Sequence, residues 1–479
     1  MSISKAFLEY FENEFFQGKA EEFSAFQKSL LRPLKKTLRV NSERVDPTVF
    51  KEAKTAQGWT LSPTENAVAF RVDRENTATA LGSTLEHLMG DFYIQELSAS
   101  MSVWHLAEGG KGPYRKWDEP FLILDMASSP GGKTTQLVEH FPNSFVVANE
   151  FAKERLSSLM ENVERMGTSD RTGVTNMNGV LYGALPETFD RILLDAPCSG
   201  EGIGFKAEES LKYWNLKNVK TIARLQEKLL VAGLVALKTG GEMLYSTCTL
   251  NRFENEGVLE GAMNALPGTF EIVFQKKFWP HAEGAGGFFV AKLKKTAPTP
   301  DNGKDFRVSP NSELVRTSDR DADRIREALR ELGTEDFDES AHDLYRYRND
   351  VLAVRKVDGV RELSETCYFL KFGERVGRLE EGKFEPNWSL GKNRDLKNVT
   401  KLVLRDEKEL HRYLSGFETE LDADSRDTTG LAPKMGEVAA APSNLANLVQ
   451  IAYQDKFLGL ERVKNGKATN SFPKEWRRK

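Results

Sequence analysis

Two cysteines of this chain lie in short polar segments that directly follow apolar runs. Cys198 comes after the run at 191–195, in the segment Asp-Ala-Pro-Cys-Ser-Gly, and Cys248 comes after 241–247, in the segment Ser-Thr-Cys-Thr. A structural cysteine usually lies in a core, where it behaves as a small hydrophobic residue. These two instead follow expected strand ends, where an open α/β sheet builds its active crevice. The pair therefore predicts thiol nucleophiles at a catalytic site.

A glycine-rich turn precedes these cysteines and has the composition of a nucleotide-binding loop. Residues 125–133 read Asp-Met-Ala-Ser-Ser-Pro-Gly-Gly-Lys. The stretch from Ala127 to Thr134 fits a permissive P-loop pattern, with 192–195 as a magnesium-binding strand. However, Pro130 lacks a backbone N–H group, and Ala127 replaces the first glycine of that pattern. Both features weaken the P-loop interpretation without excluding it.

A nucleoside cofactor without phosphates is the other interpretation of this turn. Asp125, at an expected strand end, can reach the cationic tail of an amino acid, and the small residues after it let the backbone approach a ligand. Glu150 ends the next expected strand, where an acid typically bonds both ribose hydroxyls. A P-loop enzyme does not need that acid. S-adenosylmethionine fits all of these groups.

Thiols beside such a cofactor indicate chemistry on the ring of cytosine. Carbon 5 of this ring is a poor nucleophile, but a thiolate that adds to carbon 6 converts carbon 5 into an enamine carbon. A carboxyl such as Asp195 can stabilise the charge at ring nitrogen 3 through a proton or a hydrogen bond. After methyl transfer a base must remove the proton from carbon 5, and a second thiol can assist release of the product.

The rest of the cysteine and histidine content argues against a metal site. The chain has no Cys-x-x-Cys, and none of its six histidines lies at ligand spacing from the two thiols. The third cysteine, Cys367, lies in a strand-like stretch and is expected to be structural. Three cysteines cannot form a disulfide framework in 479 residues, which favours a reducing compartment.

Composition bounds the possible partners and the location. With 67 Lys and Arg against 71 Asp and Glu, the net charge is -4, so binding to nucleic acid must rest on local patches. The N-terminus lacks the pattern of a signal peptide, and the longest apolar run, 229–237, is too short to span a bilayer. We expect a cytoplasmic protein.

Alternating strands and helices must position the chemistry described above. Expected strands cover 121–126, 144–149, 191–195, 241–247 and 287–293, and expected helices cover 134–140, 153–166 and 219–237. Strands separated by helices of this length imply a doubly wound, mostly parallel α/β sheet. The last strand follows a glycine-rich segment without a long helix, so we expect it to join antiparallel. Near the N-terminus, phenylalanines at three- and four-residue steps predict two amphipathic helices.

Three motifs in this arrangement resemble the Sun-type RNA cytosine-5 methyltransferase family, in its order and spacing. They are the segments 125–136, 195–202 and 245–251, and the resemblance continues over about 32–296. It implies a Rossmann-like class I methyltransferase fold, S-adenosyl-L-methionine as cofactor and RNA as substrate.

The resemblance also implies a role for each site residue. Cys248 would attack carbon 6, Cys198 would promote product release, and Asp195 would line the shared site of base and cofactor. From the residues alone the two thiol roles stay open, because other cytosine methyltransferases use a Pro-Cys nucleophile, which would favour Cys198. The implied cofactor-binding residues are Asp125, Ala127, Ser128, Ser129, Pro130, Gly131, Gly132, Lys133, Glu150, Asn178 and Asp195.

Two positions depart from the family pattern. Asn178 stands where the family usually has an acid that contacts the adenine amino group. An amide oxygen can accept the same hydrogen bond, so we expect binding to survive. Ser128 and Ser129 replace the usual pair of alanines, and because serine is small we expect no change in the chemistry.

The C-terminal part is similar to the extension of bacterial members of the family that act on 16S ribosomal RNA and end in a PUA-like RNA-binding domain. Residues 456–479 hold eight Lys or Arg and two acids, and four aromatic residues lie among or beside them that would stack on unpaired bases: Tyr453, Phe457, Phe472 and Trp476. The expected RNA-binding residues are Arg39, Asn41, Lys464, Lys467 and Arg477.

Together these features predict a methyltransferase that makes 5-methylcytosine in 16S rRNA of the small ribosomal subunit. The alternatives are the same chemistry on tRNA, or a P-loop NTPase acting on RNA. The oligomeric state stays open, with a monomer expected. The predicted parts are an N-terminal helical RNA-binding region (1–84), a methyltransferase core (85–296), a linker (297–318), an α+β subdomain (319–420), a flexible linker (421–442) and the end of a PUA-like domain (443–479).

Overall fold

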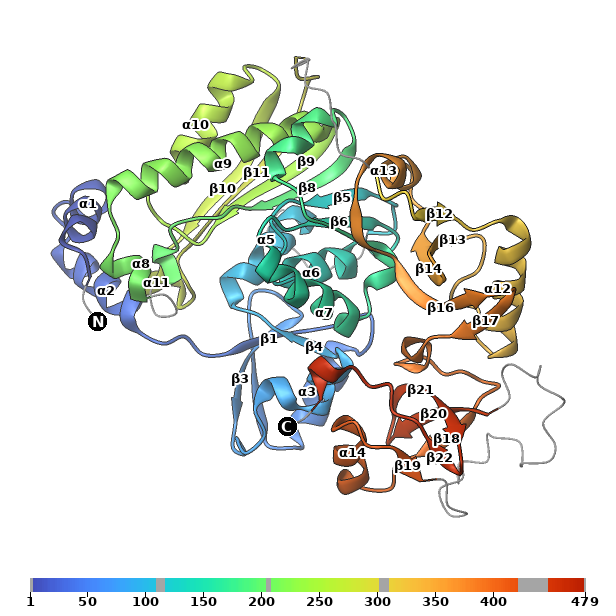
Figure 1. Ribbon diagram of the computed structural model, residues 1–479. Coiled ribbons are helices and arrows are strands. Elements are labelled where there is room, and N and C mark those ends of the chain that lie inside the picture. The colour runs from blue at the N-terminus through green and yellow to red at the C-terminus, as the bar shows by residue number, and fades with distance from the viewer. Residues whose placement is uncertain (1–2, 109–116, 204–207, 301–309, 421–446, 478–479) are drawn as a thin grey trace. The chain divides into compact units, whose positions relative to one another are not determined.

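Helices on both faces of an eight-stranded sheet form the α/β core that the sequence predicts (Figure 1). The computed structural model describes residues 3–108, 117–203, 208–300, 310–420 and 447–477. The first of its two units contains Met1–Thr79, Gly90–Pro310 and Val357–Lys371, and the second contains Ala80–Met89, Asn311–Lys356 and Phe372–Lys479.

The domain boundaries drawn from the sequence stay a prediction. The boundary expected at residue 84 falls inside Ala80–Met89, a segment that groups with the second unit. The linker expected at 421–442 lies outside the described residues, and so does part of the one expected at 297–318.

The central sheet has the order β10-β11-β9-β8-β5-β6-β7-β15. Its strands are β5 (Leu122–Asp125), β6 (Phe145–Asn149), β7 (Thr172–Thr175), β8 (Phe189–Asp195), β9 (Leu237–Thr247), β10 (Phe270–Phe278), β11 (Phe288–Lys295) and β15 (Phe369–Phe372). From β9 to β7 all neighbours are parallel, whereas β11 is antiparallel to both β9 and β10. The five strands expected from the sequence are all present, and the antiparallel direction of β11 is confirmed.

Helices cover the two faces of this sheet in two groups (Figure 1). On one face lie α5 (Leu97–Glu108), α6 (Gly132–His140) and α7 (Leu156–Met166), and on the other lie α9 (Leu216–Ala236) and α10 (Glu256–Ala265). α7 shows why such segments are helical: Leu156, Leu159, Val163 and Met166 recur at three- and four-residue steps and form its buried face. Gly167, at φ +71°, then ends the helix in the left-handed conformation.

Two strands that sequence periodicity did not indicate, β7 and β10, complete the sheet together with β15, which lies in the strand-like stretch around Cys367. β7 has four residues, Thr-Gly-Val-Thr, and is too short to show a pattern. β10, at the edge of the sheet, alternates exposed and partly buried residues over most of its length, and β15 extends the sheet beyond β7. Cys367, expected in a strand, instead caps the C-terminus of helix α13 (Val360–Thr366) and is buried.

The order of the strands reverses between β5 and β8, and this reversal creates the site. The chain builds β6 and β7 on one side of β5, and then β8 and β9 on the other side. Loops that leave the carboxyl ends of β5 and β8 therefore diverge, and open α/β sheets bind their ligands at such a point. Asp125 pairs in register with Leu193, and Asp195 with Ser246, so the polar ends of three strands share one edge.

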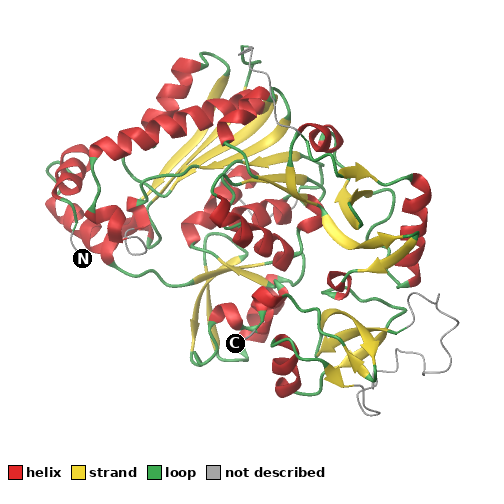
Figure 2. Ribbon diagram, in the orientation of Figure 1, coloured by secondary structure: helices red, strands yellow, loops and turns green. Residues whose placement is uncertain are grey.

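The N-terminal segment adds two helices and a small sheet to this unit. Helices α1 (Lys5–Phe15) and α2 (Ala20–Leu31) bury their phenylalanines around Trp214, as expected for packing faces. Figure 2 shows these helices next to the short helix α8 (Glu208–Lys212). The sheet β2-β3-β1-β4, with helix α3 (Pro47–Thr55), was not predicted; its strands are β1 (Thr37–Val40), β2 (Trp59–Pro63), β3 (Ala69–Arg74) and β4 (Phe92–Ile94).

The second unit contains two five-stranded sheets, in agreement with an α+β C-terminal part. One sheet has the order β12-β13-β14-β16-β17 and packs against α12 (Asp319–Glu331), and the other has the order β18-β20-β21-β22-β19 and packs against α14 (Glu407–Leu414). The strands are β12 (Leu314–Arg316), β13 (His342–Tyr347), β14 (Asp350–Arg355), β16 (Glu374–Glu380), β17 (Lys383–Pro386), β18 (Thr400–Val403), β19 (Thr419–Glu420), β20 (Leu448–Tyr453), β21 (Lys456–Lys464) and β22 (Lys467–Ala468). Among the described residues no helix is both long and apolar enough to cross a bilayer.

Candidate active site

The two loop cysteines meet at the carboxyl edge of the central sheet. Cys198 follows β8 and Cys248 follows β9, and the two Sγ atoms lie 3.0 Å apart. Both are free thiols and both are partly exposed. A disulfide would need an S–S distance near 2.05 Å, so the contact is a hydrogen bond between a thiol and its neighbour. The structure thus brings together two side chains that are 50 residues apart in the sequence.

Close backbone packing fixes the loop of Cys248. The N–H group of Gly202 donates to the Cys248 carbonyl at 3.0 Å, and that of Gly287 donates to the Gly202 carbonyl at 2.8 Å. A Cβ atom at position 202 would lie 2.3 Å from the Gly287 carbonyl oxygen and 2.8 Å from that of Cys248. Only glycine fits at position 202, because no side chain can share that space with two backbones.

An ion pair lies beside the thiols. Lys133, in the first turn of α6, places its Nζ 2.7 Å from Oδ2 of Asp195, and the Ser246 hydroxyl donates to Oδ1 at 2.8 Å. Burial lowers the pKa of Lys133, but the charge of Asp195 and the hydrogen bond to it outweigh burial and raise that pKa overall. Asp195 accepts from both neighbours, which is the behaviour of a carboxylate. A fixed positive charge therefore lies next to the reactive sulfurs.

The surroundings of Cys198 disfavour its thiolate form. The hydrogen bond to Cys248 raises the pKa of Cys198 well above its usual value, and burial and the negative charges of Glu254 and Asp195 raise it further. A thiol is a poor nucleophile while protonated. The raised pKa therefore favours the protonated form of Cys198.

The glycine-rich turn and Glu150 form one cradle beside the ion pair. Gly131, at φ +101°, turns the chain into α6, and the hydroxyls of Ser128 and Ser129 donate to the carbonyls of Asp125 and Arg155 at 2.9 Å. Glu150 is buried and accepts from the backbone N–H groups of Ser129 at 3.3 Å and Ala152 at 2.8 Å. Asn178 is exposed, and its side-chain oxygen accepts from the Val180 N–H at 3.1 Å.

Asp125 is the least satisfied carboxyl of this cradle. Its Oδ2 accepts from the Thr134 hydroxyl at 2.7 Å, while Oδ1 is buried with no hydrogen-bond partner among the described residues. Burial raises the pKa of Asp125 to about 7, and the Thr134 hydroxyl and Lys133 oppose that shift. A buried acceptor that lacks a donor suits a cationic or hydrogen-bonding ligand.

Known proteins share this core and its motifs. The model of the family described as 16S rRNA methyltransferase RsmB/F matches residues 116–294. A ribosomal RNA small subunit methyltransferase F from Escherichia coli O9:H4 (strain HS) is 37% identical over 331 residues, which cover 65% of this chain and 67% of that protein. Another, from Shigella dysenteriae serotype 1 (strain Sd197), is 38% identical over 336 residues with the same coverage. This chain belongs to the RsmB/F methyltransferase family.

Solved structures agree with this assignment. A methyltransferase homologue from Pyrococcus horikoshii superimposes with a TM-score of 0.52 at 26% identity, over 61% of this chain and 95% of that one. NSun6 from Pyrococcus horikoshii, solved with SFG, gives a TM-score of 0.52 at 22% identity over 61% and 98% of the two chains, and shares the fold. The resemblance seen in the sequence is confirmed, the chain is a methyltransferase, and this assignment replaces the P-loop interpretation of the glycine-rich turn.

The methyltransferase also contains a pair of buried carboxyls that the sequence reasoning missed. Glu254 accepts from the Ser199 N–H at 3.0 Å and from Gln226 at 2.9 Å, and Asn251 donates to Glu201 at 2.7 Å and to Glu254 at 2.9 Å. The Ser199 hydroxyl contacts both carboxyls. One hydroxyl proton can serve only one of them, so the second contact requires a protonated carboxyl. The available signal was position: Glu201 lies in the Cys198 motif, and Glu254 follows Asn251 by three residues.

Burial, followed by the charge of Glu201, raises the pKa of Glu254 to about 7. The shared Ser199 ties this pair to the Cys198 loop, because Ser199 is the next residue after the cysteine. The loop is therefore held in place most firmly when one of the two carboxyls carries a proton.

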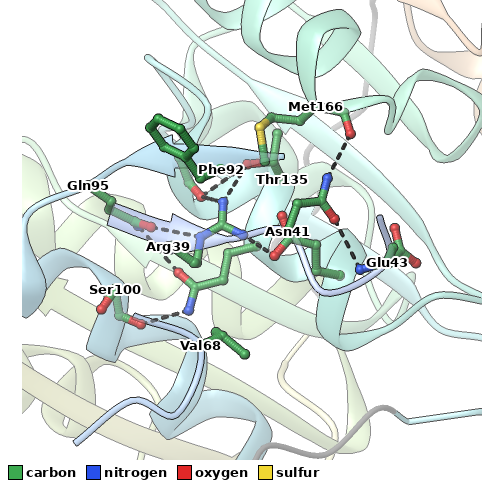
Figure 3. Close-up of polar contacts among 12 residues, drawn as sticks. Arg39, Asn41, Glu43, Val68, Phe92, Gln95, Ser100, Thr135 and Met166 are labelled. Atoms are coloured by element: carbon green, nitrogen blue, oxygen red, sulfur yellow. Dashed lines mark hydrogen bonds and ion pairs between the residues drawn. The ribbon is translucent and has the colours of Figure 1, made fainter. Parts of the chain in front are cut away.

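Two of the predicted RNA-binding residues lie inside the first unit instead of on its surface (Figure 3). Arg39 is 0% exposed; its guanidinium contacts the carboxylate of Glu139 and donates to Gln95 at 2.9 Å and to Thr135 at 2.9 Å. Asn41 is also fully buried and donates to the Met166 carbonyl at 3.1 Å. A buried cation needs a partner, and Glu139 supplies it. The guanidinium of Arg39 is therefore engaged inside the protein and is not available to an RNA phosphate.

The other three predicted RNA-binding residues lie in the second unit. Lys464 and Lys467 are exposed, while Arg477 is partly buried and donates to the Phe472 carbonyl at 3.2 Å. The expected aromatic stacking platform is absent for three of its four rings, because Tyr453, Phe472 and Trp476 are buried in the core of this unit. In the sequence, aromatic residues that pack in a core cannot be told from aromatic residues that stack on bases, because both lie among basic residues in the same way.

Replacing Arg39 tests its assignment to the interior. Arg39→Ala leaves the Glu139 carboxyl buried without its partner, so we expect the free energy of unfolding to fall by about 3 kcal/mol. Denaturant unfolding measures this loss. The RNA affinity of the folded fraction should stay within a factor of two of the parent value, and a stable variant with weak RNA binding would show that Arg39 serves RNA after all.

Replacing Glu254 tests the shared proton. Its carboxyl has an ordinary value of 4.5 in the unfolded chain and about 7 in the folded one, so the folded state binds more protons between these values. The free energy of unfolding should therefore fall as the pH rises from 4.5 through 7, by about 3 kcal/mol from this residue. Glu254→Gln should flatten that decline in unfolding measured at several pH values. The exposed Glu260→Gln on α10 is the control, and an equal slope in all three proteins would refute the assignment.

Proposed function

We propose that this methyltransferase transfers a methyl group from S-adenosylmethionine to carbon 5 of a cytosine in 16S rRNA through a covalent bond to Cys248. The observation that carries this proposal is the pair of sulfurs, 3.0 Å apart, beside the Lys133–Asp195 ion pair. The relatives named ribosomal RNA small subunit methyltransferase F support the choice of RNA. A cytoplasmic location follows from that substrate as a further expectation.

The cradle of the glycine-rich turn fits S-adenosylmethionine. Asp125 Oδ1, buried and without a partner among the described residues, would take the amino group of the methionine tail, and Glu150 would take the ribose hydroxyls. The side-chain oxygen of Asn178 retains a second lone pair for the adenine amino group, since only Val180 uses the first. When bound there, the cofactor supplies an electrophilic methyl group.

The chain's own groups would divide the chemistry as follows. Cys248, which is partly exposed, loses its proton to solvent. Its sulfur then forms a bond to carbon 6 of the target base while the electron pair of the carbon 5–carbon 6 double bond moves toward the ring nitrogen. The Lys133 ammonium donates toward the charge that develops, because Asp195, as a carboxylate, can only accept. Asp195 instead accepts from the amino group of cytosine.

Product release then regenerates the thiol. After carbon 5 has taken the methyl group, a base removes its proton, a role within reach of Asp195. The carbon 6–sulfur bond breaks, and its electron pair returns to Cys248. Cys198 holds a proton 3.0 Å from that sulfur and donates a hydrogen bond to the leaving thiolate, which then takes a proton back from solvent. The role of Cys198 in release thus rests on its position next to Cys248 and on the proton that it retains.

The two thiols give opposite results when each is replaced by serine. Cys198→Ser should form the bond to RNA but release it slowly, so a protein–RNA adduct should accumulate on denaturing gels. Cys248→Ser should form no adduct and should lose activity by at least a thousandfold, because a hydroxyl is a far weaker nucleophile than a thiolate. Cys367→Ser, the buried third cysteine, is the control and should behave as the parent does. A reversed adduct pattern would overturn the thiol assignment.

The RNA class is tested separately with a radiolabelled methyl donor. Purified protein is incubated with 16S rRNA, with small-subunit particles and with tRNA, and the radioactivity in each RNA is counted. Bisulfite sequencing of the labelled RNA then maps the methylated cytosine. Label in 16S rRNA is the expected result. Label confined to tRNA would end the ribosomal proposal while leaving the thiol chemistry intact.

A further inference from the structure

A pocket of about 350 Å³ lies in the first unit, outside the thiol and cofactor cradle. One wall is the N-terminal sheet, through Arg71 on β3; a second is the start of α5, through Leu97 and Met101; the third is the end of β10 and the segment after it, through Phe278 and Ala285. Its volume is in the range of about 300–1,000 Å³ that is typical of ligand pockets.

The pocket adjoins the catalytic thiol through two of its walls. Phe278 belongs to an apolar cluster with Phe288, and Cys248 packs against that cluster. Ala285 directly precedes the Gly286–Gly287 segment, which bonds through Gly202 to the Cys248 carbonyl. The pocket and the loop of Cys248 thus share packing residues and belong to one region of the first unit.

The pocket is lined by four buried apolar side chains and by one cation, Arg71, that has no partner among the described residues. Leu97, Met101, Phe278 and Ala285 are each less than a tenth exposed. The guanidinium of Arg71 is partly buried, and it forms no hydrogen bond or ion pair with the part of the chain that the structure describes. A half-buried guanidinium is normally paired, and its planar fork matches a phosphate.

Two carboxyls also line the pocket, and their positions limit what can bind there. Glu283 already pairs with Lys276, with Nζ and Oε1 3.3 Å apart, and Glu65 is exposed at the rim. These carboxylates exclude a purely anionic ligand, but they can accept hydrogen bonds from the amino groups of a base or from ribose hydroxyls. The combination suits a nucleotide: its phosphate is anionic, the faces of its base are apolar, and its amino and hydroxyl groups donate hydrogen bonds.

We propose that this pocket holds a nucleotide next to the target cytosine of the RNA, with Arg71 on its phosphate and the apolar side chains against its base or ribose. The inference rests on the proposed function, because it takes RNA as the substrate. A base that leaves its stack to reach a thiol needs its neighbours held, and single-stranded RNA is held by phosphate contacts combined with apolar surfaces. Arg71 thus contributes to RNA binding and has no part in bond making.

The test compares two arginines of the same strand. Arg74 lies on the other face of β3, where its guanidinium sits 5.3 Å from the Trp59 ring centre, and it does not line the pocket. Arg71→Ala should weaken binding of a 16S rRNA fragment by roughly tenfold, measured by fluorescence anisotropy, and should lower the salt dependence of binding by about one phosphate contact. Arg74→Ala should change the affinity by less than twofold. Arg71→Lys, which keeps the charge, should recover part of the loss.

A neutral methylphosphonate at single linkages around the target cytosine identifies the phosphate. At one linkage the methylphosphonate should weaken RNA binding by the parent protein roughly tenfold. It should not change RNA binding by Arg71→Ala, because that variant already lacks the contact. The KM for RNA should rise in Arg71→Ala while kcat and cofactor affinity stay within twofold.

The outcomes separate this inference from the function on which it rests. Equal RNA binding by Arg71→Ala and Arg74→Ala, or a methylphosphonate effect that is the same in the parent and in Arg71→Ala at every linkage, would overturn the pocket assignment whatever the enzyme methylates. Parent protein that binds the fragment with the Arg71 difference but transfers no methyl group would support the pocket and defeat the proposed reaction.

Discussion

The pairing of β8 with β9 is the constraint on which the rest of the site depends. Because the two strands are parallel neighbours, Asp195 and Ser246 stand in register, and the loops that follow them leave the sheet side by side. The loop of Cys248 is held by its close backbone contact with Gly202 and Gly287. The loop of Cys198 is held by the contacts of Ser199 with Glu201 and Glu254. Neither sulfur could lie 3.0 Å from the other if either loop were free to move by the width of a methyl group.

Buried charge is the second theme of this molecule. Lys133 and Asp195 compensate one another, and Arg39 pairs with Glu139. Burial nevertheless raises the pKa of Glu139 to about 7, as it does for Glu254 and Asp125. Such groups contribute little net stability, since their desolvation offsets much of the gain from pairing. Their importance lies in position: Asp195 holds the Lys133 ammonium beside the thiols, and a cation that is already oriented needs no reorganisation when charge develops on a ligand.

The sequence was most informative where chemistry and secondary structure coincide. The five strands it indicated and the helices between them are present. Their apolar runs and amphipathic repeats are long enough to be distinguished from a chance arrangement of residues. It gave no sign of β7, whose four residues include a glycine, or of the N-terminal sheet, whose strands are short and pair across intervening segments. Arg39 was expected at the surface and is buried instead. The sequence of a basic cluster does not show whether its side chains face solvent or a buried carboxylate such as Glu139.

The amino-acid sequence by itself determined the family, the α/β class and the residue types of the site, since strand ends, glycine turns and thiol motifs are local patterns. Only the tertiary structure decided that the two sulfurs touch, that Glu201 and Glu254 share one hydroxyl, that Arg39 and Asn41 are interior and that Arg71 faces a pocket. Each of these facts depends on segments far apart in the chain. Burial and proximity between such segments arise from packing, and no single stretch of sequence encodes them.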